Sequence, residues 1–275
     1  MQILDNGYAA NGKNERFTTH GDIFPIHGAT MTPAGRVAKS GRRSFPAEER
    51  SKSAPEWNHY RVVANNGEVR LSVNGKEVTI GRESSPRKGY LCLESEGSEC
   101  HFRSIRIKEL PSTNPPLEQV AKVAEGFRTL YTGVDLTGWR ADASAKAHWR
   151  VNDWRLECGA KPSAPPLATE QEFGDFVLVA DWFCPAKPDS TKADLVGAIA
   201  LRGSETALVR LERAQAGAWH RLQITLRGDE LILEQDGKSA GPTQRVAGLA
   251  RRGPIILRTH GEPITFANLF LRELK

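Results

Sequence analysis

The chain has 275 residues, of which 39% are hydrophobic and 26% charged, with a net charge of +5. This composition is ordinary for a globular chain of one large or two modest domains. No stretch approaches the roughly 18 apolar residues of a membrane span, so we expect none. The positive charge concentrates between Arg36 and Arg61, where glutamates alternate with it and aromatic residues are few. This pattern favours a solvated loop and no nucleic-acid partner.

Three segments recur in the same order in the two halves of the chain. The pairs are Trp57–Val62 with Trp219–Ile224, Val69–Lys76 with Leu231–Lys238, and Arg87–Leu110 with Arg251–Leu274. The first two pairs share an offset of 162 residues (219 minus 57), and the third has 164 (253 minus 89). Asn74-Gly75 and Asp236-Gly237 are strong hairpin signals, because the turn residues need positive φ. We interpret the chain as a duplicated domain.

Within these segments apolar and polar residues alternate, as in Val69, Leu71 and Val73. This is the period of a strand with one buried face. Short strands between turn residues, with almost no helical periodicity, predict an all-β sandwich. The predicted domains are 1–110 for the first copy and 126–275 for the second, joined by a linker at 111–125.

The first copy is predicted to lack its opening strands. The second copy has strand patterns at Trp149–Glu157 and Asp175–Phe183, whereas an irregular stretch, Gly28–Glu56, fills this part of the first copy. A sandwich without its first strands exposes an unpaired edge and an apolar face. We therefore expect a partner chain or self-association to cover the first domain, unless the coding start has been placed too late.

The two copies resemble the 3-keto-disaccharide hydrolase family, long described as a domain of unknown function. Glu125–Trp139 is similar to the family's "GF..LFNG.DLTGW" motif, and Gln2–Asn6 is similar to its "E.QILDN" motif. Weaker matches to its "W.V.DG", "y.dFeL", "EWN", "NG" and "FRNIRI" motifs are Trp149–Asp153, Phe173–Leu178, Trp57–Asn58, Asn74–Gly75 and Phe102–Ile107. The resemblance covers nearly all the chain outside the linker. It implies a concanavalin A-like, jelly-roll sandwich in each half and an extracytoplasmic location, although Met1–Asn6 shows no signal peptide.

Two departures from the family pattern bear on the site. Met1 stands where the family has an acidic residue ahead of its "QILD" motif, and Trp154 replaces a turn glycine. The second copy shows nothing like "QILDN" between Phe183 and Trp219. Any catalytic site is therefore expected in the first copy.

The resemblance implies carbohydrate substrates, namely glycosides oxidised to a ketone at C3. The ketone acidifies the C2 proton, so a base can remove it while the glycosidic oxygen leaves C1. Such a site needs a base of moderate pKa and either a divalent metal or a cationic donor at the keto oxygen. Asp5, His20 and Asp22 are the candidate catalytic residues, because they lie close to the family motif. Ordinary turn chemistry explains the same residues as well.

Seven residues are candidates for substrate binding: Gln2, Asn6, His27, Arg36, Glu94, Glu96 and Trp154. Arg36 opens a basic segment, 36–52, whose length is typical of a lid or binding loop. Glu94 and Glu96 suit a sugar or a hard cation, but Arg258 and His260 at the matching positions favour a polar strand end. Trp154 lies in a turn, where an exposed indole suits sugar stacking. Trp57 and Trp219 are predicted to be core residues.

The four cysteines have no metal-binding spacing. Cys92 and Cys100 flank a turn, so a hairpin would place them opposite each other as a disulfide or as small buried residues. Ile256 and Ile264 at the matching positions favour burial.

Two functions remain in view. One is a glycoside hydrolase or lyase acting on 3-keto-glycosides, with its site in the first domain. The other is a non-catalytic carbohydrate-binding or cell-surface interaction protein on the same fold, because fold does not decide function.

Overall fold

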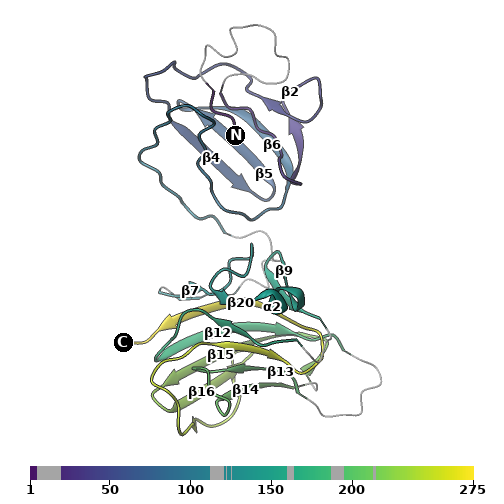
Figure 1. The fold of residues 1–275 in the computed structure, drawn as a ribbon, viewed down its shortest axis with the longest axis vertical. Helices are drawn as coiled ribbons and strands as arrows, with labels where there is room; N and C mark the ends of the chain where they lie inside the picture. Colours follow the sequence, from purple (N-terminus) through teal and green to yellow (C-terminus); the bar gives the residue numbers. More distant parts are fainter. Residues whose placement is uncertain are drawn as a thin grey trace. The chain divides into compact units, whose positions relative to one another are not determined.

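The chain divides into two compact units, Met1–Asn114 and Pro115–Lys275 (Figure 1). The structure is a computed structural model, and it describes residues 1–4, 20–111, 121, 123–124, 126–159, 164–186, 195–212 and 215–275. Within these residues the elements are strands, apart from the short helix α2 (Ala143–His148). The predicted all-β fold class is confirmed. No helix in the described ranges is long and apolar enough to cross a membrane.

The first unit is built on one four-stranded antiparallel sheet. Its order is β1 (Thr30–Ala34), β6 (Lys76–Ser85), β5 (Glu68–Val73) and β4 (Tyr60–Asn65). A separate pair joins β2 (Arg36–Val37) to β3 (Ser44–Phe45). The prediction of an irregular stretch over 28–56 is therefore wrong, because three strands form there. A small apolar cluster joins Ile23 to Leu71 and Val73 of β5 and Val78 of β6.

The predicted strands between residues 86 and 111 do not form. This whole segment is described, and it contains no strand. Its apolar side chains are exposed, with Leu91 at 69% and Ile107 at 74% of their full accessibility. The second unit provides the physical reason. There the matching strand, β20 (Ile264–Glu273), lies between β12 (Phe176–Phe183) and β10 (Arg155–Cys158), and the described part of the first unit offers no such neighbours.

The second unit is a sandwich of two antiparallel sheets. The large sheet has the order β17 (Lys238–Ser239), β16 (Glu230–Gln235), β15 (Trp219–Arg227), β12, β20, β10 and β9 (Trp149–Asn152), with β18 (Gln244–Arg245) beside β16 and β7 (Arg128–Thr129) beside β20. The small sheet has the order β14 (Leu208–Glu212), β13 (Leu195–Ala200), β19 (Ile256–Thr259), β11 (Leu167–Thr169) and β8 (Trp139–Arg140). Fully buried side chains of both sheets, such as Leu178 and Ile199, share one core. The strands predicted at 149–157 and 175–183 are confirmed.

The two units contain hairpins of the same register. Tyr60 pairs with Val73 in the first unit, and Leu222 pairs with Gln235 in the second, at the offset of 162 (222 minus 60). All six pairs of the β4–β5 hairpin recur at this offset between β15 and β16. The following turns match too, since Asn74 and Asp236 have φ of 48° and 52°. The two hairpins therefore share one register, and duplication of the whole domain stays a prediction.

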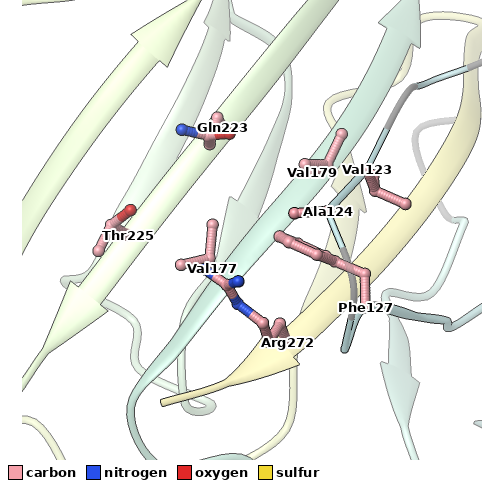
Figure 2. Close-up of a pocket in the computed structure, with 8 residues that line it drawn as sticks. All are labelled: Val123, Ala124, Phe127, Val177, Val179, Gln223, Thr225 and Arg272. Carbon is pink, nitrogen blue, oxygen red and sulfur yellow. The ribbon is translucent and has the colours of Figure 1, made fainter.

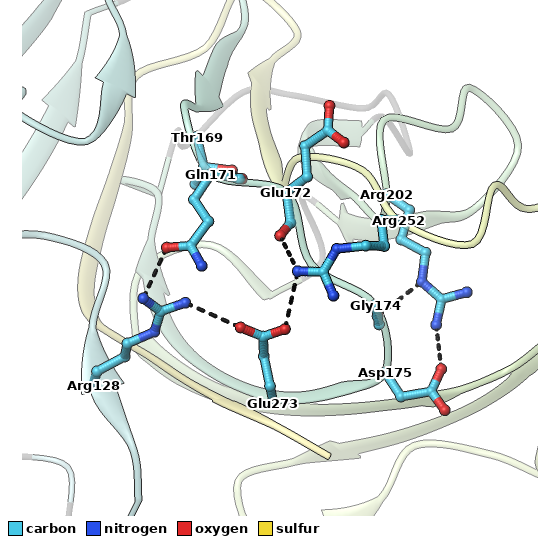
Figure 3. A network of polar contacts seen from close by, with 9 residues as sticks. All are labelled: Arg128, Thr169, Gln171, Glu172, Gly174, Asp175, Arg202, Arg252 and Glu273. Atoms are coloured by element: carbon cyan, nitrogen blue, oxygen red, sulfur yellow. Dashed lines mark hydrogen bonds and ion pairs between the residues drawn. The ribbon is translucent and has the colours of Figure 1, made fainter. Parts of the chain in front are cut away.

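A network of arginines and carboxylates ties the strand ends together in the second unit (Figure 3). Glu273, at the end of β20, accepts hydrogen bonds from Arg128 at 3.4 Å and Arg252 at 3.1 Å. Nearby, Arg202 donates to Asp175 Oδ1 at 2.6 Å and to the carbonyl oxygens of Gly174, Gly228 and Ala250. Because the Arg202 side chain is only 3% exposed, these four bonds anchor the loops of this end from inside.

Candidate functional site

The start of the chain pairs with the segment that carries His20 and Asp22. The Gln2 N–H donates to the Asp22 carbonyl, and the Gly21 N–H donates to the Gln2 carbonyl, both at 2.9 Å. Gly21 has a φ of 90°, and a Cβ there would lie 3.1 Å from Leu71. Glycine suits this position because side chains rarely adopt such a φ and a Cβ would be in tight contact with Leu71. The two hydrogen bonds to Gln2 hold the backbone of Gly21 and Asp22 and so position His20 and Asp22, the residues on either side of Gly21.

Asp22 is completely buried and forms an ion pair with Arg43 at 3.2 Å. The pair follows from the neighbouring bridge, in which Ile23 and Ser44 exchange both backbone hydrogen bonds. The Arg43 guanidinium also lies 3.7 Å from the centroid of the Phe24 ring. Arg43 keeps 19% of its side chain exposed. Asp22 and Phe24 therefore hold a cation whose outer edge meets solvent.

His20 contacts Tyr60, the first residue of β4. The His20 Nδ1 and Tyr60 Oη atoms are 2.8 Å apart, and the rings meet edge to face. Burial raises the pKa of Tyr60, and the negative charges of Glu49 and Asp22 raise it further. The phenol therefore stays neutral and acts as a hydrogen-bonding partner for the imidazole. A histidine oriented by a fixed partner is the arrangement that general bases use.

The two glutamates predicted to bind substrate lie near the same segment. The Gln2 side chain donates to Glu96 Oε2 at 3.2 Å. Burial and the charge of Arg43 lower the pKa of the Met1 amino group, whereas the charges of Asp22 and Glu94 raise it. These interactions place Gln2, Glu94 and Glu96 in one neighbourhood with Asp22. Both glutamates are exposed.

The other predicted site residues are not part of this cluster. His27 lies in an exposed turn with a φ of 50°. Arg36, in β2, lies 5.4 Å from the Phe45 ring and donates to the Pro46 carbonyl at 3.5 Å. Trp154 belongs to the second unit. Asp5 and Asn6 lie outside the described residues, so their roles stay predictions.

The divalent metal also stays a prediction. Metal ions in proteins need several converging His, Cys, Asp or Glu side chains. In the part of the chain that the structure describes, no group of three such side chains could hold an ion. The partly exposed guanidinium of Arg43 fits the other requirement of the chemistry, a cationic donor for the keto oxygen.

Sequence reasoning missed Arg43 and Tyr60. Arg43 lies among several basic residues of segment 36–52, and nothing in its spacing separates it from them. Tyr60 lies 40 positions after His20, and only the folded chain brings the two side chains together. The sequence carries no signal that links Tyr60 to His20.

The prediction that Trp57 and Trp219 are core residues is wrong. Trp57 is 46% exposed, with the Arg103 guanidinium 4.0 Å from its ring centroid. Trp219 is partly exposed and packs against Trp154 at 5.4 Å between ring centroids. Trp57 precedes β4, and Trp219 lies on the outer face of β15, because the alternate residues Leu222 and Ile224 are the ones in the core. Trp154 is partly exposed, as expected for a turn residue.

Cys92 and Cys100 are both free thiols with exposed side chains. The expectation of two small buried residues is therefore wrong, and no disulfide joins them. The reason is the absence of the hairpin that would have placed them opposite each other.

Comparisons with known proteins bear on the first unit. Residues 1–108 match the sequence model of a family described as the 3-keto-alpha-glucoside-1,2-lyase-like domain. The resemblance inferred for the first unit is confirmed in this form, and residues 126–275 lie outside the match. No curated protein matches the chain.

Several solved structures have distantly similar folds. A "putative glycosyl hydrolase" from Parabacteroides distasonis ATCC 8503 is 16% identical with a TM-score of 0.43, covering 55% of this chain and 95% of that chain. The carbohydrate-binding module CBM66 from Bacillus subtilis is 12% identical with a TM-score of 0.38, covering 50% and 96%. The beta-glucanase of Bacillus licheniformis is 9% identical with a TM-score of 0.35, covering 50% and 94%. Similarity at this distance does not indicate substrate or activity.

Proposed function

We propose that the first unit acts as a hydrolase or lyase on 3-keto-glycosides, with its site at the cluster formed by His20, Tyr60, Arg43 and Asp22. The family match over residues 1–108 supports the substrate class. The observation that carries the site is the 2.8 Å contact between His20 Nδ1 and Tyr60 Oη. The partly exposed guanidinium of Arg43 is paired with Asp22, two residues after His20, and supplies the cationic donor that this chemistry requires.

In the proposed reaction His20 removes the C2 proton of the 3-keto sugar. With Nδ1–H donated to the Tyr60 oxygen, the lone pair of the imidazole is at Nε2, which takes the proton. The C2–H electrons form a C1=C2 double bond as the bond from C1 to the glycosidic oxygen breaks. The leaving oxygen takes up a proton, and addition of water to the new double bond completes a net hydrolysis. Arg43 stabilises the negative charge that develops on the C3 oxygen.

Asp22 has a supporting role in this proposal. Its carboxylate is completely buried, so it does not meet a substrate directly. Its ion pair with Arg43 orients the guanidinium, as neighbouring groups commonly do for catalytic side chains. Asp5 and Asn6 belong to the family-like motif and remain proposed site residues, together with Gln2, Glu94 and Glu96.

The alternative is a non-catalytic carbohydrate-binding or cell-surface interaction protein. The burial of Asp22 favours this alternative, because a predicted catalytic acid that is buried in an ion pair with Arg43 does not reach a substrate. The two functions differ in whether a 3-keto-glycoside is consumed.

The test is turnover of a nitrophenyl 3-keto-α-glucoside by the full chain, with and without added Mg²⁺, followed by release of nitrophenol. We expect His20→Asn to lower kcat by about 10²- to 10⁴-fold, the usual contribution of a general base. Tyr60→Phe removes one hydrogen bond and should cost roughly tenfold. The Asp5→Asn variant tests the motif residue in the same assay.

His59→Asn is the matched control. His59 is an exposed neighbour of Tyr60, and the bond to the Asn74 side chain comes from its backbone N–H. This variant should keep full activity. No turnover by the folded wild-type chain, with or without the metal, would decide for the non-catalytic alternative. Turnover that His20→Asn leaves unchanged would place the base elsewhere.

A further inference from the structure

On the outer face of the large sheet in the second unit, the side chains of β12 and β15 change in character from one end of the two paired strands to the other. Every second residue of β12 faces away from the core, because Leu178 and Ala180 between them are core residues. The register pairs these outward residues with those of β15: Val177 with Thr225, Val179 with Gln223, Asp181 with Arg221, and Phe183 with Trp219. We call these four cross-strand pairs rungs one to four. Rungs one and two are apolar with a hydroxyl or an amide, rung three is charged, and rung four is aromatic.

The first two rungs form the floor of a cavity of about 400 Å³. Figure 2 shows Phe127 over the sheet, with Val123 and Ala124 on the segment that crosses beside it. Gln223 and Thr225 line one side, and Arg272, from β20, lines the other. The cavity therefore combines apolar walls with a few converging polar groups, which is the usual composition of a small-molecule site.

Arg272 has unused hydrogen-bonding capacity in this cavity. Its guanidinium carbon lies 5.0 Å from the centroid of the Phe127 ring. None of the described residues accepts a hydrogen bond from its Nε. Arginine presents five donors in a fixed plane. A ligand with hydroxyl or carbonyl oxygens would satisfy donors that the protein leaves without an acceptor.

The third rung is a doubly bonded ion pair. Arg221 donates from Nε and from a terminal nitrogen to the two oxygens of Asp181, each at 2.6 Å, and Asn268 adds a bond of 2.5 Å. Asp181 is nearly buried, whereas 37% of the Arg221 side chain is exposed. The pair is therefore held rigidly and presents its cationic side to solvent.

The fourth rung is an aromatic surface. The rings of Phe183 and Trp219 have centroids 5.5 Å apart, and Trp154 from the β9–β10 turn lies 5.4 Å beyond Trp219. All three residues are partly exposed. The distance from Val177 to Phe183 along the strand is about 20 Å, at roughly 3.3 Å per residue. This length is enough for several linked hexose units.

We propose that this face binds a glycan chain of gluco-configured pyranoses, with one end in the cavity beside Phe127 and the other on Trp219 and Trp154. In a gluco-configured pyranose the hydroxyls are equatorial, so the ring faces present C–H groups that suit an indole, and the hydroxyls at the rim both donate and accept hydrogen bonds. The alternation of apolar, amide, charged and aromatic rungs matches that amphipathic character. An acyl chain would leave the rigid Asp181–Arg221 pair and the Arg272 donors unused. The site is independent of the chemistry proposed for the first unit.

The test is binding of cellotetraose and of maltotetraose to the full chain, at concentrations up to about 10 mM. Neither sugar carries a 3-keto group, so failure of this proposal and failure of the enzymatic one are distinguishable. The indole N–H signals in ¹H–¹⁵N spectra identify the site. We expect saturable shifts for Trp219 and Trp154, and none for Trp57 of the first unit.

Trp219→Ala and Gln223→Ala should each weaken binding by at least about tenfold. Trp57→Ala and Arg210→Ala are the controls, because Trp57 is an exposed residue of the first unit and Arg210 is an exposed residue of β14 in the small sheet. Absence of shifts with both tetraoses in the wild-type chain would overturn the proposal without any variant. Unchanged affinity in either test variant would overturn it as well.

Discussion

At the residue scale, the buried arginine is the side chain whose loss the second unit should tolerate least. Arg202 has a φ of 49°, is 5% exposed and satisfies three carbonyl oxygens and one carboxylate. Those carbonyls belong to three separate loops, so a single guanidinium replaces the water that each would otherwise need.

We expect Arg202→Met to lower the free energy of unfolding of the second unit by about 3–5 kcal/mol, because four hydrogen bonds of a buried guanidinium are lost, each worth about 1 kcal/mol. Arg202→Lys should recover only part of the loss, since an ammonium cannot reproduce the planar set of bonds. Chemical denaturation followed by tryptophan fluorescence measures both, with exposed Arg210→Met as the control. A loss in Arg202→Met no greater than in the control would show that water replaces the guanidinium without cost.

A second prediction at this scale concerns pH. Burial raises the pKa of Asp236, but hydrogen bonds from His220 and from the Arg221 backbone, both at 2.8 Å, lower it by more. The pKa of Asp236 is therefore lowered overall. A carboxyl whose folded pKa is lowered stabilises the fold above its unfolded pKa of about 3.9, and this contribution disappears as pH falls through the folded value. The stabilising window therefore includes neutral pH.

Asp236→Asn should lower the melting temperature of the second unit at pH 7, and the difference from wild type should shrink at about pH 3. The equivalent turn of the first unit supplies the control. There the Asn74 amide oxygen accepts the His59 N–H at 2.9 Å, and an amide does not titrate. Any effect of Asn74→Ala on the melting temperature of the first unit should therefore be the same at both pH values. A difference for Asp236→Asn that is the same at both pH values would contradict the assignment.

Sequence reasoning at the residue scale succeeded where a residue had to satisfy a local rule. Asn74 and Asp236 were identified as turn residues because type I′ geometry requires positive φ, and both have it. It failed for Trp57, which precedes β4 and therefore lies outside the alternating pattern of that strand. It also missed the His20–Tyr60 contact, which depends on strand pairing between distant segments.

At the element scale, strands form where both neighbours are available. The hydrophobic pattern of Phe102–Leu110 is the same as that of β20, yet only β20 is a strand. Alternation predicts which face a strand would bury, but a strand also needs hydrogen-bonding partners. A pattern shared by the two halves of the chain therefore predicts the same element only when the neighbouring strands are present. The prediction that another chain or a second copy covers the exposed segment remains open.

The reactivity of the cysteine thiols tests whether residues 90–110 are exposed and unpaired. Cys92 and Cys100 are exposed, whereas Cys158 and Cys184 are buried, and burial raises the pKa of Cys158 to about 11. Because the thiolate is the reactive form, we expect a disulfide reagent at about pH 8 to modify Cys92 and Cys100 rapidly. Cys158 and Cys184 should react only after denaturation. Slow reaction of all four cysteines in the native chain would indicate that residues 90–110 are paired or covered.

At the scale of the whole molecule, the two units differ greatly in the size of their cores. The cluster in the described part of the first unit consists of Ile23, Leu71, Val73 and Val78, with three partly buried neighbours. The core of the second unit includes large aromatic side chains such as Phe176 and Trp182, both completely buried. Hydrophobic stabilisation grows with the apolar area removed from water, so the first unit should be the less stable of the two.

Calorimetry of the full chain should therefore show two unfolding transitions, the first unit melting at the lower temperature. Leu71→Ala removes a completely buried side chain from the small core, which costs about 2–5 kcal/mol. In a unit of this size the loss corresponds to a shift of roughly 10 °C or more, and only the lower transition should move. Phe176→Ala should lower only the upper transition, by the same cavity argument. A single transition that both variants shift equally would mean that the units unfold together. The small core would then be stabilised by contacts beyond its own residues.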